Sequence, residues 1–389
     1  MAPQRPSLPV LKEKPGFCVL PWLHVSASVD GVWGRCCLDS SMYYDFYYTE
    51  QEEPEFILRK DTIGCSPKSK YADRNPEKAL NLLDVFNSEE MKKTRLAMLN
   101  GEMIPACQYC FECEAGGGES QRQRMNEIYG SLPGVPELIE RTEEDGHLDA
   151  FPFYLDLRFG NTCNLKCVMC RFPVSSAWGT MTKWSKSKID PFADDPELWE
   201  LLKENVSNIK VVYFAGGEPF LQPLHFKMLD LIIESGHAKN VYVAYNTNLT
   251  VLPPGIFDKL AQFADVSIGA SCDGTGEVFE AIRSGAKWET FALNVRTAKQ
   301  HAKLKLSVTV QKNNLANLEE LVEWAYSEDV PIDLTNILMQ PANLSVRNIP
   351  LDEKRQLKER YEEVIGRYMQ NGRESVAREL KMILDFMWS

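Results

Sequence analysis

The 389-residue chain is predicted to fold as an α/β protein built around a parallel sheet. From about residue 150 onward, apolar segments rich in β-branched residues alternate with segments of helical periodicity. Strands are expected at Phe153–Arg158, Ile209–Phe214, Val241–Tyr245, Val266–Ala270, Leu304–Val310 and Ile332–Leu338. Strands separated by helices need right-handed crossovers, so the sheet is parallel and chemistry is expected at the carboxyl ends of the strands. Periodicity alone leaves open both a doubly wound sheet and an incomplete barrel.

Helices are expected between these strands, at Glu197–Asn205, Leu221–Glu234, Trp288–His301 and Leu318–Tyr326. Two amphipathic helices after Pro350, at Asp352–Met369 and Arg373–Met387, are expected to pack on the outside of the sheet. Residues 1–148 are rich in Pro, Gly, Cys and aromatic residues and contain one clear helix, at about Ser88–Leu99. The predicted domains are therefore 1–148, 149–346 and 347–389, with the acidic stretch Glu140–Gly146 at the first boundary.

The composition argues against several classes of partner. The chain has 43 Lys and Arg against 55 Asp and Glu, and its net charge of −12 repels phosphate backbones. No apolar run approaches the roughly 20 residues of a membrane-spanning helix, and the first residues lack the apolar core of a signal peptide. We therefore expect a cytoplasmic protein that binds neither nucleic acid nor membrane.

The cysteines carry the strongest signal. There are 11, unevenly placed, in a chain without a secretion signal, which favours metal or redox chemistry over disulfides. Cys163, Cys167 and Cys170 directly follow the first strand of the α/β region. Three thiolates on one loop can bind three irons of a four-iron cluster and leave the fourth open to another ligand. Zinc is the alternative, but a structural zinc usually takes four ligands.

This loop and the motifs after later strands resemble the radical S-adenosylmethionine (SAM) superfamily over about residues 150–345. The motifs are Gly216-Gly217-Glu218-Pro219, Asn246-Thr247-Asn248 and Ser271-Cys272-Asp273-Gly274, followed by Arg283. The resemblance implies a partial (β/α)6 barrel. It also implies that Gly216, Gly217 and Glu218 receive the amino group of SAM, and that Asn246, Ser271 and Arg283 contact its ribose and carboxylate. Met169 stands where relatives often place an aromatic residue over the adenine, and methionine can pack against that ring.

The amino-terminal cysteines resemble a second metal module. Cys18, Gly31 and Cys36 are spaced like the first half of a SPASM/twitch-type auxiliary-cluster motif, although here the module precedes the barrel. The later half is similar to Cys107-Gln-Tyr-Cys110-Phe-Glu-Cys113. The resemblance implies one auxiliary iron–sulfur cluster, held by Cys18, Cys36 and two or three of Cys107, Cys110 and Cys113. Cys37 and Cys65 are then spare thiols, and Tyr43–Tyr48 is expected to pack over the metal region. A structural zinc ribbon built from the same cysteines is the alternative.

The resemblance implies an enzyme that cleaves SAM reductively to a 5′-deoxyadenosyl radical, which abstracts hydrogen from a peptide or small polar substrate. Oxidation or crosslinking is the expected outcome, with an electron donor such as flavodoxin or ferredoxin. The alternative reaction is a redox-neutral epimerisation in which Cys272 donates a hydrogen atom, although Cys272 is also interpretable as a small core residue. A non-catalytic iron–sulfur or zinc scaffold is the alternative of another class. Gln311, Asn313 and Gln340 follow the fifth and sixth strands and are expected to line the cavity or to form turns.

Overall fold

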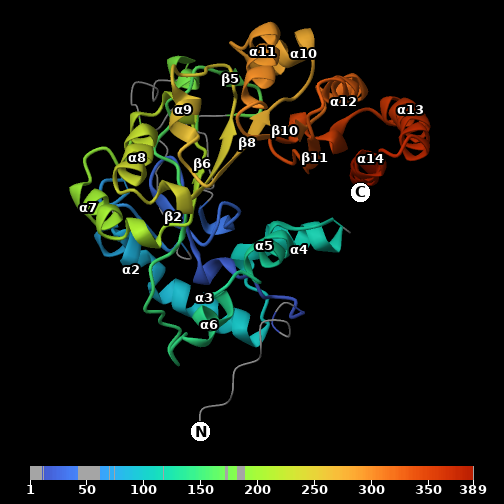
Figure 1. Ribbon diagram of the computed structural model, residues 1–389. Helices are drawn as coiled ribbons and strands as arrows, with labels where there is room; N and C mark the ends of the chain where they lie inside the picture. Colours follow the sequence, from blue (N-terminus) through green and yellow to red (C-terminus); the bar gives the residue numbers. More distant parts are fainter. Residues whose placement is uncertain are drawn as a thin grey trace. The chain divides into compact units, whose positions relative to one another are not determined.

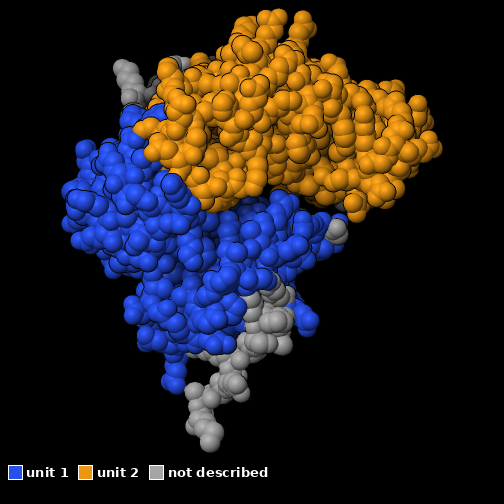
Figure 2. Space-filling view, viewed as in Figure 1, with its two compact units in different colours: residues 1–161, 188–216, 223–241 blue, residues 162–187, 217–222, 242–389 orange. Residues whose placement is uncertain are grey.

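The computed structural model describes residue 11 and residues 13–42, 62–69, 71–73, 75–116, 118–170, 174–181 and 189–388. The Tyr43–Tyr48 segment lies outside these ranges. The chain divides into two compact units, coloured separately in Figure 2. Unit 1 comprises Met1–Asn161, Lys188–Gly216 and Pro223–Val241, and unit 2 comprises Thr162–Ser187, Gly217–Gln222 and Tyr242–Ser389. The three-domain division derived from the sequence stays a prediction.

The described strands of unit 1 form a sheet in the order β6-β4-β1-β2-β3. They are β1 (His24–Ala27), β2 (Val32–Gly34), β3 (Gly64–Cys65), β4 (Tyr154–Leu157) and β6 (Val211–Phe214). Strands β6, β4 and β1 are parallel, whereas β2 and β3 are antiparallel to their neighbours. The predicted strands that correspond to β4 and β6 are confirmed. Strand β1 was not predicted, because its four residues are all buried and show no alternation.

The helices of unit 1, labelled in Figure 1, precede and follow β4 along the chain. They are α2 (Leu82–Phe86), α3 (Glu89–Asn100), α4 (Gln108–Ala115), α5 (Gln121–Tyr129), α6 (Val135–Glu140), α7 (Pro196–Glu204) and α8 (Pro223–Glu234). The predicted helix α3 is confirmed; the Ser88 side chain caps its first turn and Gly101, at φ 79°, ends it. The expectation of one clear helix before residue 148 was incomplete, because α2, α4, α5 and α6 are too short to show a strong helical period.

The described part of unit 2 contains a parallel sheet in the order β11-β10-β8-β7 and a small antiparallel pair, β5 with β9. The strands are β5 (Lys166–Cys167), β7 (Tyr242–Thr247), β8 (Asp265–Ser271), β9 (Arg283–Ser284), β10 (Lys303–Val310) and β11 (Ile332–Ile337). The four longer strands confirm the predicted ones. Together with unit 1 they give the mixed α/β fold, mostly parallel, that the sequence predicts.

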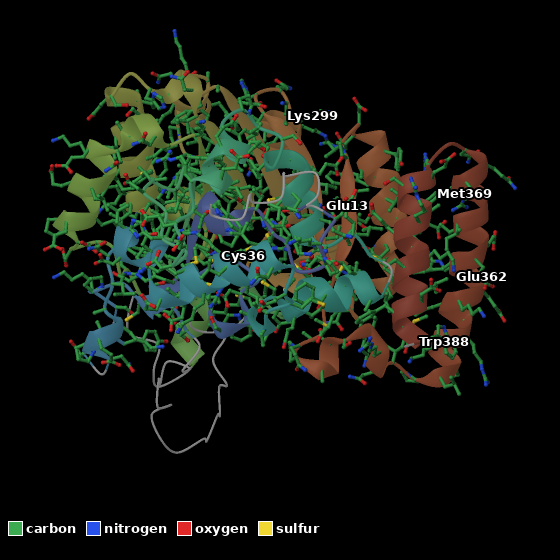
Figure 3. The ribbon with its side chains drawn as sticks, turned by 90° about the horizontal axis from the view of Figure 1, so that it is seen from below. Glu13, Cys36, Lys299, Glu362, Met369 and Trp388 are labelled. Carbon is green, nitrogen blue, oxygen red and sulfur yellow. The ribbon has the colours of Figure 1, made fainter. Side chains whose placement is uncertain are left out.

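Helices α9 (Ile256–Leu260), α10 (Gly276–Ile282), α11 (Trp288–Ala298) and α12 (Leu318–Ser327) connect the strands of unit 2. The two carboxyl-terminal helices are α13 (Leu351–Gln370) and α14 (Glu374–Trp388). Helix α14 contacts β11, where the Leu334 N–H donates to Glu379 Oε2 at 2.7 Å, and this agrees with the predicted packing against the sheet. Glu362 and Met369, labelled in Figure 3, lie on the exposed face of α13. In the described ranges, none of the helices has both the length and the apolarity that crossing a membrane requires.

Candidate active site

The three-cysteine loop belongs to unit 2 and is fixed by its own backbone contacts. Cys167 lies in β5, where it pairs across the ladder with Arg283 of β9. The Cys163 N–H donates to Ser176 Oγ at 3.1 Å, and the Trp178 indole donates to Cys167 O at 3.2 Å. Cys163 and Cys170 are half-buried, and Cys167 is buried. These contacts hold the loop through main-chain atoms.

The residues of this loop fit an iron–sulfur cluster by the chemistry of their donor atoms. Three thiols lie within eight residues, and the Leu165 N–H points to Cys163 Sγ at 3.5 Å, as amides do toward cluster sulfurs. Burial raises the pKa of the Cys163 thiol, and the Leu165 N–H opposes that rise. Across the described ranges, no three His, Cys, Asp or Glu side chains are drawn together closely enough to hold a metal ion. A cluster would therefore have to gather these thiols as it binds.

Glu218, from the Gly-Gly-Glu-Pro motif, is fully buried and ties two segments of unit 2 together. Its Oε1 accepts from the Phe220 N–H at 3.1 Å and from the Thr247 hydroxyl at 2.6 Å, and its Oε2 accepts from the Asn248 N–H at 2.7 Å. Burial raises the pKa of this carboxyl group from 4.5 to about 7, and the three hydrogen bonds limit the rise. The carboxylate thus shapes the loop that follows β7.

Asn248 connects this loop to the cysteines. Its Nδ2 donates to Asn164 Oδ1 at 3.0 Å and lies 3.9 Å from Cys163 Sγ. Its Oδ1 accepts from both the N–H and the hydroxyl of Thr250. Glu218, Asn248 and Cys163 therefore form one connected hydrogen-bonded path from the Gly-Gly-Glu-Pro motif to the three-cysteine loop.

Arg283 contacts the three-cysteine loop from the β9 side. Its Nη2 lies 2.7 Å from Asp273 Oδ2, and its Nη1 lies 3.9 Å from Cys167 Sγ. Both side chains of the ion pair are buried. The Thr309 N–H donates to Asp273 Oδ1 at 2.7 Å, so Asp273 joins the ends of β8 and β10 to Arg283. The structure therefore brings Arg283, predicted from the sequence as a SAM contact, to a predicted cluster ligand.

The other residues predicted to contact SAM occupy varied positions. Asn246 is exposed near the end of β7, and a side chain on its ladder partner Gly269 would come within 2.5 Å of Asn246 Oδ1. Ser271, the last residue of β8, is half-buried, as is Met169 between Cys167 and Cys170. Gly216 has φ 88° and packs against Val29 and Arg158 of unit 1, so only glycine suits that position. Gly217 begins the neighbouring segment of unit 2.

Two buried polar groups near the strand ends of unit 2 lack hydrogen-bond partners among the described residues. They are Nε of Arg283 and the whole side-chain amide of Gln311, a residue that is fully buried just after β10. An unsatisfied buried amide costs about 1–3 kcal/mol. Orphaned donors and acceptors at the carboxyl ends of parallel strands fit a polar ligand such as SAM, which would satisfy them.

Cys272 is fully buried directly after β8. Its thiol donates to Gly274 O at 3.4 Å, and burial raises its pKa well above the ordinary value. Its own N–H donates to Ser307 O at 3.0 Å. These contacts are those of a core cysteine, and a hydrogen-donor role for Cys272 stays a prediction.

In unit 1 the predicted auxiliary ligands influence one another's pKa, although the described residues include no three side chains drawn together as metal ligands. Burial is the main cause that raises the pKa of Cys18, to about 12, and the charge of Cys110 adds to it. Burial also raises the pKa of Cys36 and Cys107; the charges of Cys37, Cys107 and Cys18 add to the rise at Cys36, and those of Cys18, Asp39 and Cys110 add to the rise at Cys107. Figure 3 labels Cys36. Cys18, Cys36, Cys107 and Cys110 therefore form one interacting set of thiols.

The remaining cysteines of unit 1 stand apart from this set to different degrees. Cys113 is exposed; the partial burial of its thiol is the first cause that raises its pKa, and the charge of Cys110 adds to the rise. Burial raises the pKa of Cys37 to about 11, and the charge of Asp156 adds to the rise. Cys65 packs in an apolar cluster with Val32 and Tyr71. The contacts of Cys65 are those of a structural residue.

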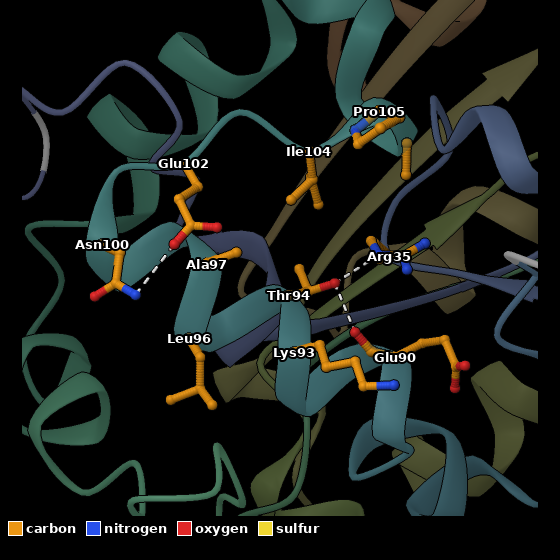
Figure 4. Close-up of a pocket in the computed structure, with 11 residues that line it drawn as sticks. Arg35, Glu90, Lys93, Thr94, Leu96, Ala97, Asn100, Glu102, Ile104 and Pro105 are labelled. Atoms are coloured by element: carbon orange, nitrogen blue, oxygen red, sulfur yellow. Dashed lines mark hydrogen bonds between the residues drawn. The ribbon is translucent and has the colours of Figure 1, made fainter.

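Residues that are next to Cys36 and Cys107 in the sequence help to line a cavity of about 570 Å³. Helix α3 and the segment before Cys107 line it, as Figure 4 shows, together with Arg35, the residue before Cys36. Arg35 is buried; its Nε donates to Thr94 Oγ1 at 2.7 Å and its Nη1 to Asp39 Oδ2 at 2.8 Å. Most of the cavity wall is apolar.

Sequence reasoning missed the residues that hold these sites together. Thr247 and Asn248 were noted as part of a motif but not as partners of Glu218, which lies 29 residues or more away. Arg122 and Asn126, which contact the segment around Cys18, carried no functional signal beyond their place after the Cys107–Cys113 group. Asp156, which accepts from Ser26 Oγ at 3.0 Å across the β1–β4 ladder, had none.

Comparisons with known proteins give one family match and several solved structures that are similar in part. Residues 157–325 match the radical SAM superfamily. A search of curated proteins gives no match. Among solved structures, anSMEcpe with bound AdoMet is similar at 19% identity and a TM-score of 0.41, over 55% of this chain and 60% of that chain.

Two further solved structures are similar in part. SuiB from Streptococcus suis bound to S-adenosylmethionine matches at 15% identity and a TM-score of 0.40, over 72% of this chain and 62% of that chain. TYW1 with a lysine-pyruvate adduct bound matches at 15% identity and a TM-score of 0.32, over 50% of this chain and 67% of that chain. The chain spans about 60% of the length of the first of these structures. The family match covers residues 157–325 and leaves the rest of the chain unmatched.

Proposed function

We propose that this protein is a radical SAM enzyme that generates a 5′-deoxyadenosyl radical and abstracts hydrogen from a peptide or small polar substrate. The observation that carries the proposal is the convergence of Asn248 and Arg283 on the three-cysteine loop within a matched radical SAM domain. Cys163, Cys167 and Cys170 would hold the cluster. When bound, such a cluster supplies one electron for the reductive cleavage of SAM. The radical chemistry is therefore carried out by the cofactors.

The protein's own residues bind and orient SAM. We assign the acidic Glu218 and the adjacent glycines to its amino group, Asn246, Ser271 and Arg283 to its ribose and carboxylate, and Met169 to its adenine. Arg283 supports this assignment because its Nε and Nη1 have no carboxylate partner in the structure, while its Nη2 is paired with Asp273. The orphaned amide of Gln311 would gain partners from SAM or from the substrate.

An auxiliary iron–sulfur cluster in unit 1 forms the second part of the proposal. The interacting set Cys18, Cys36, Cys107 and Cys110 provides four thiols, which is the number that completes a cluster shell. A fully ligated cluster suits electron transfer, and it could accept an electron from a product radical. We therefore favour oxidation or crosslinking over epimerisation, with a cytoplasmic electron donor such as flavodoxin or ferredoxin.

The test is the release of deoxyadenosine from SAM. Protein reconstituted with iron and sulfide under anaerobic conditions is mixed with SAM and dithionite, and deoxyadenosine is measured by chromatography. The wild-type chain is expected to form deoxyadenosine, whereas Cys163→Ala, Cys167→Ala and Cys170→Ala each abolish it. Cys65→Ala, a matched substitution at the thiol packed with Val32 and Tyr71, is expected to keep it.

Two results would decide against the proposal. Deoxyadenosine formation that survives all three loop substitutions would remove the loop from the chemistry. A wild-type protein that binds zinc in place of iron and forms no deoxyadenosine would favour the non-catalytic scaffold.

A further inference from the structure

One helix of unit 1, α5, contacts the chain on both sides of Cys18. Asn126 Nδ2 donates to Phe17 O at 3.0 Å, and Asn126 Oδ1 accepts from the Val19 N–H at 2.7 Å. Arg122 Nη1 donates to the same Phe17 O at 2.8 Å. Arg122 and Asn126 are one helical turn apart on one face of α5 and are 6% and 5% exposed. The peptide groups before and after Cys18 are therefore both bound by this face.

The start of the same helix contacts Cys110 on α4. The Arg122 N–H donates to the Cys110 thiol, and the Ser120 hydroxyl lies within hydrogen-bond reach of the same sulfur. Ser120 is the N-cap of α5 and forms a capping box with Gln123. The first turn of α5 thus presents donors to the sulfur of Cys110, and sulfur ligands of clusters commonly accept such hydrogen bonds.

An ion pair between the buried Arg122 and the half-buried Glu114 fastens α4 to α5, which lie side by side in Figure 1. Glu114 of α4 accepts from Arg122 Nε at 2.9 Å and from Arg122 Nη2 at 2.5 Å. The Ser120 hydroxyl also donates to Glu114, at 2.5 Å. Arg122 donates to Glu114 through Nε and Nη2 and to Phe17 O through Nη1. One side chain therefore links α4, which carries Cys110, to the segment that carries Cys18.

We propose that Arg122 and Asn126 are positioning residues for the auxiliary cluster, which hold Cys18 and Cys110 in place before metal enters and set the charge around it. The proposal rests on the proposed auxiliary cluster and deepens it. The two cysteines are far apart in the sequence, so bringing them together costs loop-closure entropy. Because α5 already holds both segments in the folded protein, metal binding does not have to provide that free energy. The Arg122 cation stabilises negative charge on the reduced cluster, and the Glu114 carboxylate opposes it.

The experiment uses the whole chain with Cys163, Cys167 and Cys170 replaced by Ala. Any iron that this parent protein binds as a cluster is then assigned to the auxiliary site. Iron and sulfide per chain are measured after anaerobic reconstitution, and the midpoint potential is measured by EPR-monitored titration. Asn126→Ala is expected to lose at least half of the parent's iron. Glu127→Gln, on the exposed face of the same helix, is the matched control and is expected to load like the parent.

The potential separates positioning from a general loss of folding, because it is measured on the molecules that hold a cluster. Arg122→Met is expected to lower the potential, Glu114→Gln to raise it, and Arg122→Lys to load less iron at an unchanged potential. Iron content and potential equal to the parent's in Asn126→Ala and Arg122→Met would overturn the proposal. A parent that binds no iron would overturn the auxiliary cluster and this inference together, while deoxyadenosine formation by the wild-type chain would still stand.

Discussion

Arg283 and Asp273 form a buried ion pair, with Nη2 2.7 Å from Oδ2, at the end of β8. The same guanidinium reaches Cys167 Sγ at 3.9 Å through Nη1. Burial lowers the pKa of Arg283 but the charge of Asp273 outweighs it, so the pKa is raised. The pair therefore fixes a cation beside a predicted cluster ligand, where the proposed function would have it bind an anionic group of SAM.

Arg283→Met is expected to lower the free energy of unfolding by about 3–5 kcal/mol, because it leaves the Asp273 carboxylate buried without its cation. Adding Asp273→Asn to that variant is expected to restore part of the loss. Denaturant unfolding of the single and double variants measures both effects. Arg296→Met, which breaks an exposed pair with Glu328, serves as the control and should change stability little. Equal losses in Arg283→Met and Arg296→Met would contradict the account.

Glu218 makes stability depend on pH in a defined direction. Its pKa is about 7 in the folded protein against an ordinary 4.5, so the native state binds more protons than the unfolded state between these values. The free energy of unfolding therefore falls as pH rises from 4.5 through 7, by about 3 kcal/mol from this group. Glu218→Gln is expected to remove that part of the pH dependence. The measurement is denaturant unfolding of both proteins at pH 5 and pH 8.5; parallel behaviour would contradict the assignment.

Gln311→Leu tests the orphaned amide. Replacing an unsatisfied buried amide by an apolar group of similar size is expected to raise the free energy of unfolding by about 1–2 kcal/mol. If the amide serves SAM or substrate, the same change weakens SAM binding by about three- to tenfold. Calorimetry of the reconstituted protein measures the affinity, with the exposed Gln300→Leu as the control. A loss of stability in Gln311→Leu would show that the amide has partners within the protein.

Arg95 is a fully buried cation in unit 1 that binds carbonyl groups from three segments. It donates to Pro21 O, Phe86 O and Gly146 O at 3.0, 2.5 and 3.1 Å, and burial lowers its pKa to about 10. Arg95→Met is expected to lower the free energy of unfolding by about 3 kcal/mol, since three buried carbonyls lose their donor. Lys93→Met, at an exposed position of the same helix, is the control. Thermal or denaturant unfolding that fails to separate the two variants would count against this interpretation.

The sequence predicted the periodic part of the fold and the motifs that lie within one loop. Strands such as β10 alternate between exposed and buried residues, and Cys163, Cys167 and Cys170 are read directly from their spacing. Strand β1 was not predicted because it is short and entirely buried, so its sequence shows neither the strand period of two residues nor the helical period of 3.6.

The contacts that assemble the sites could not be predicted, because they join residues far apart in the chain. Arg122 reaches Phe17 across 105 residues, and Asn248 reaches Cys163 across 85. No periodicity relates such pairs, since they depend on how separate elements pack. The motifs could therefore be recognised in the sequence, whereas the contacts between them came from the structure.

The central claim is that the loop of Cys163, Cys167 and Cys170 binds a four-iron cluster whose open iron takes SAM. The most direct measurement is the EPR spectrum of the reduced, reconstituted protein with and without SAM, compared with Cys163→Ala. The account predicts that SAM shifts the signal of the wild-type cluster and that this response is lost in Cys163→Ala, which leaves only a signal indifferent to SAM. A wild-type spectrum that SAM does not change, or a response that survives the substitution, would contradict it.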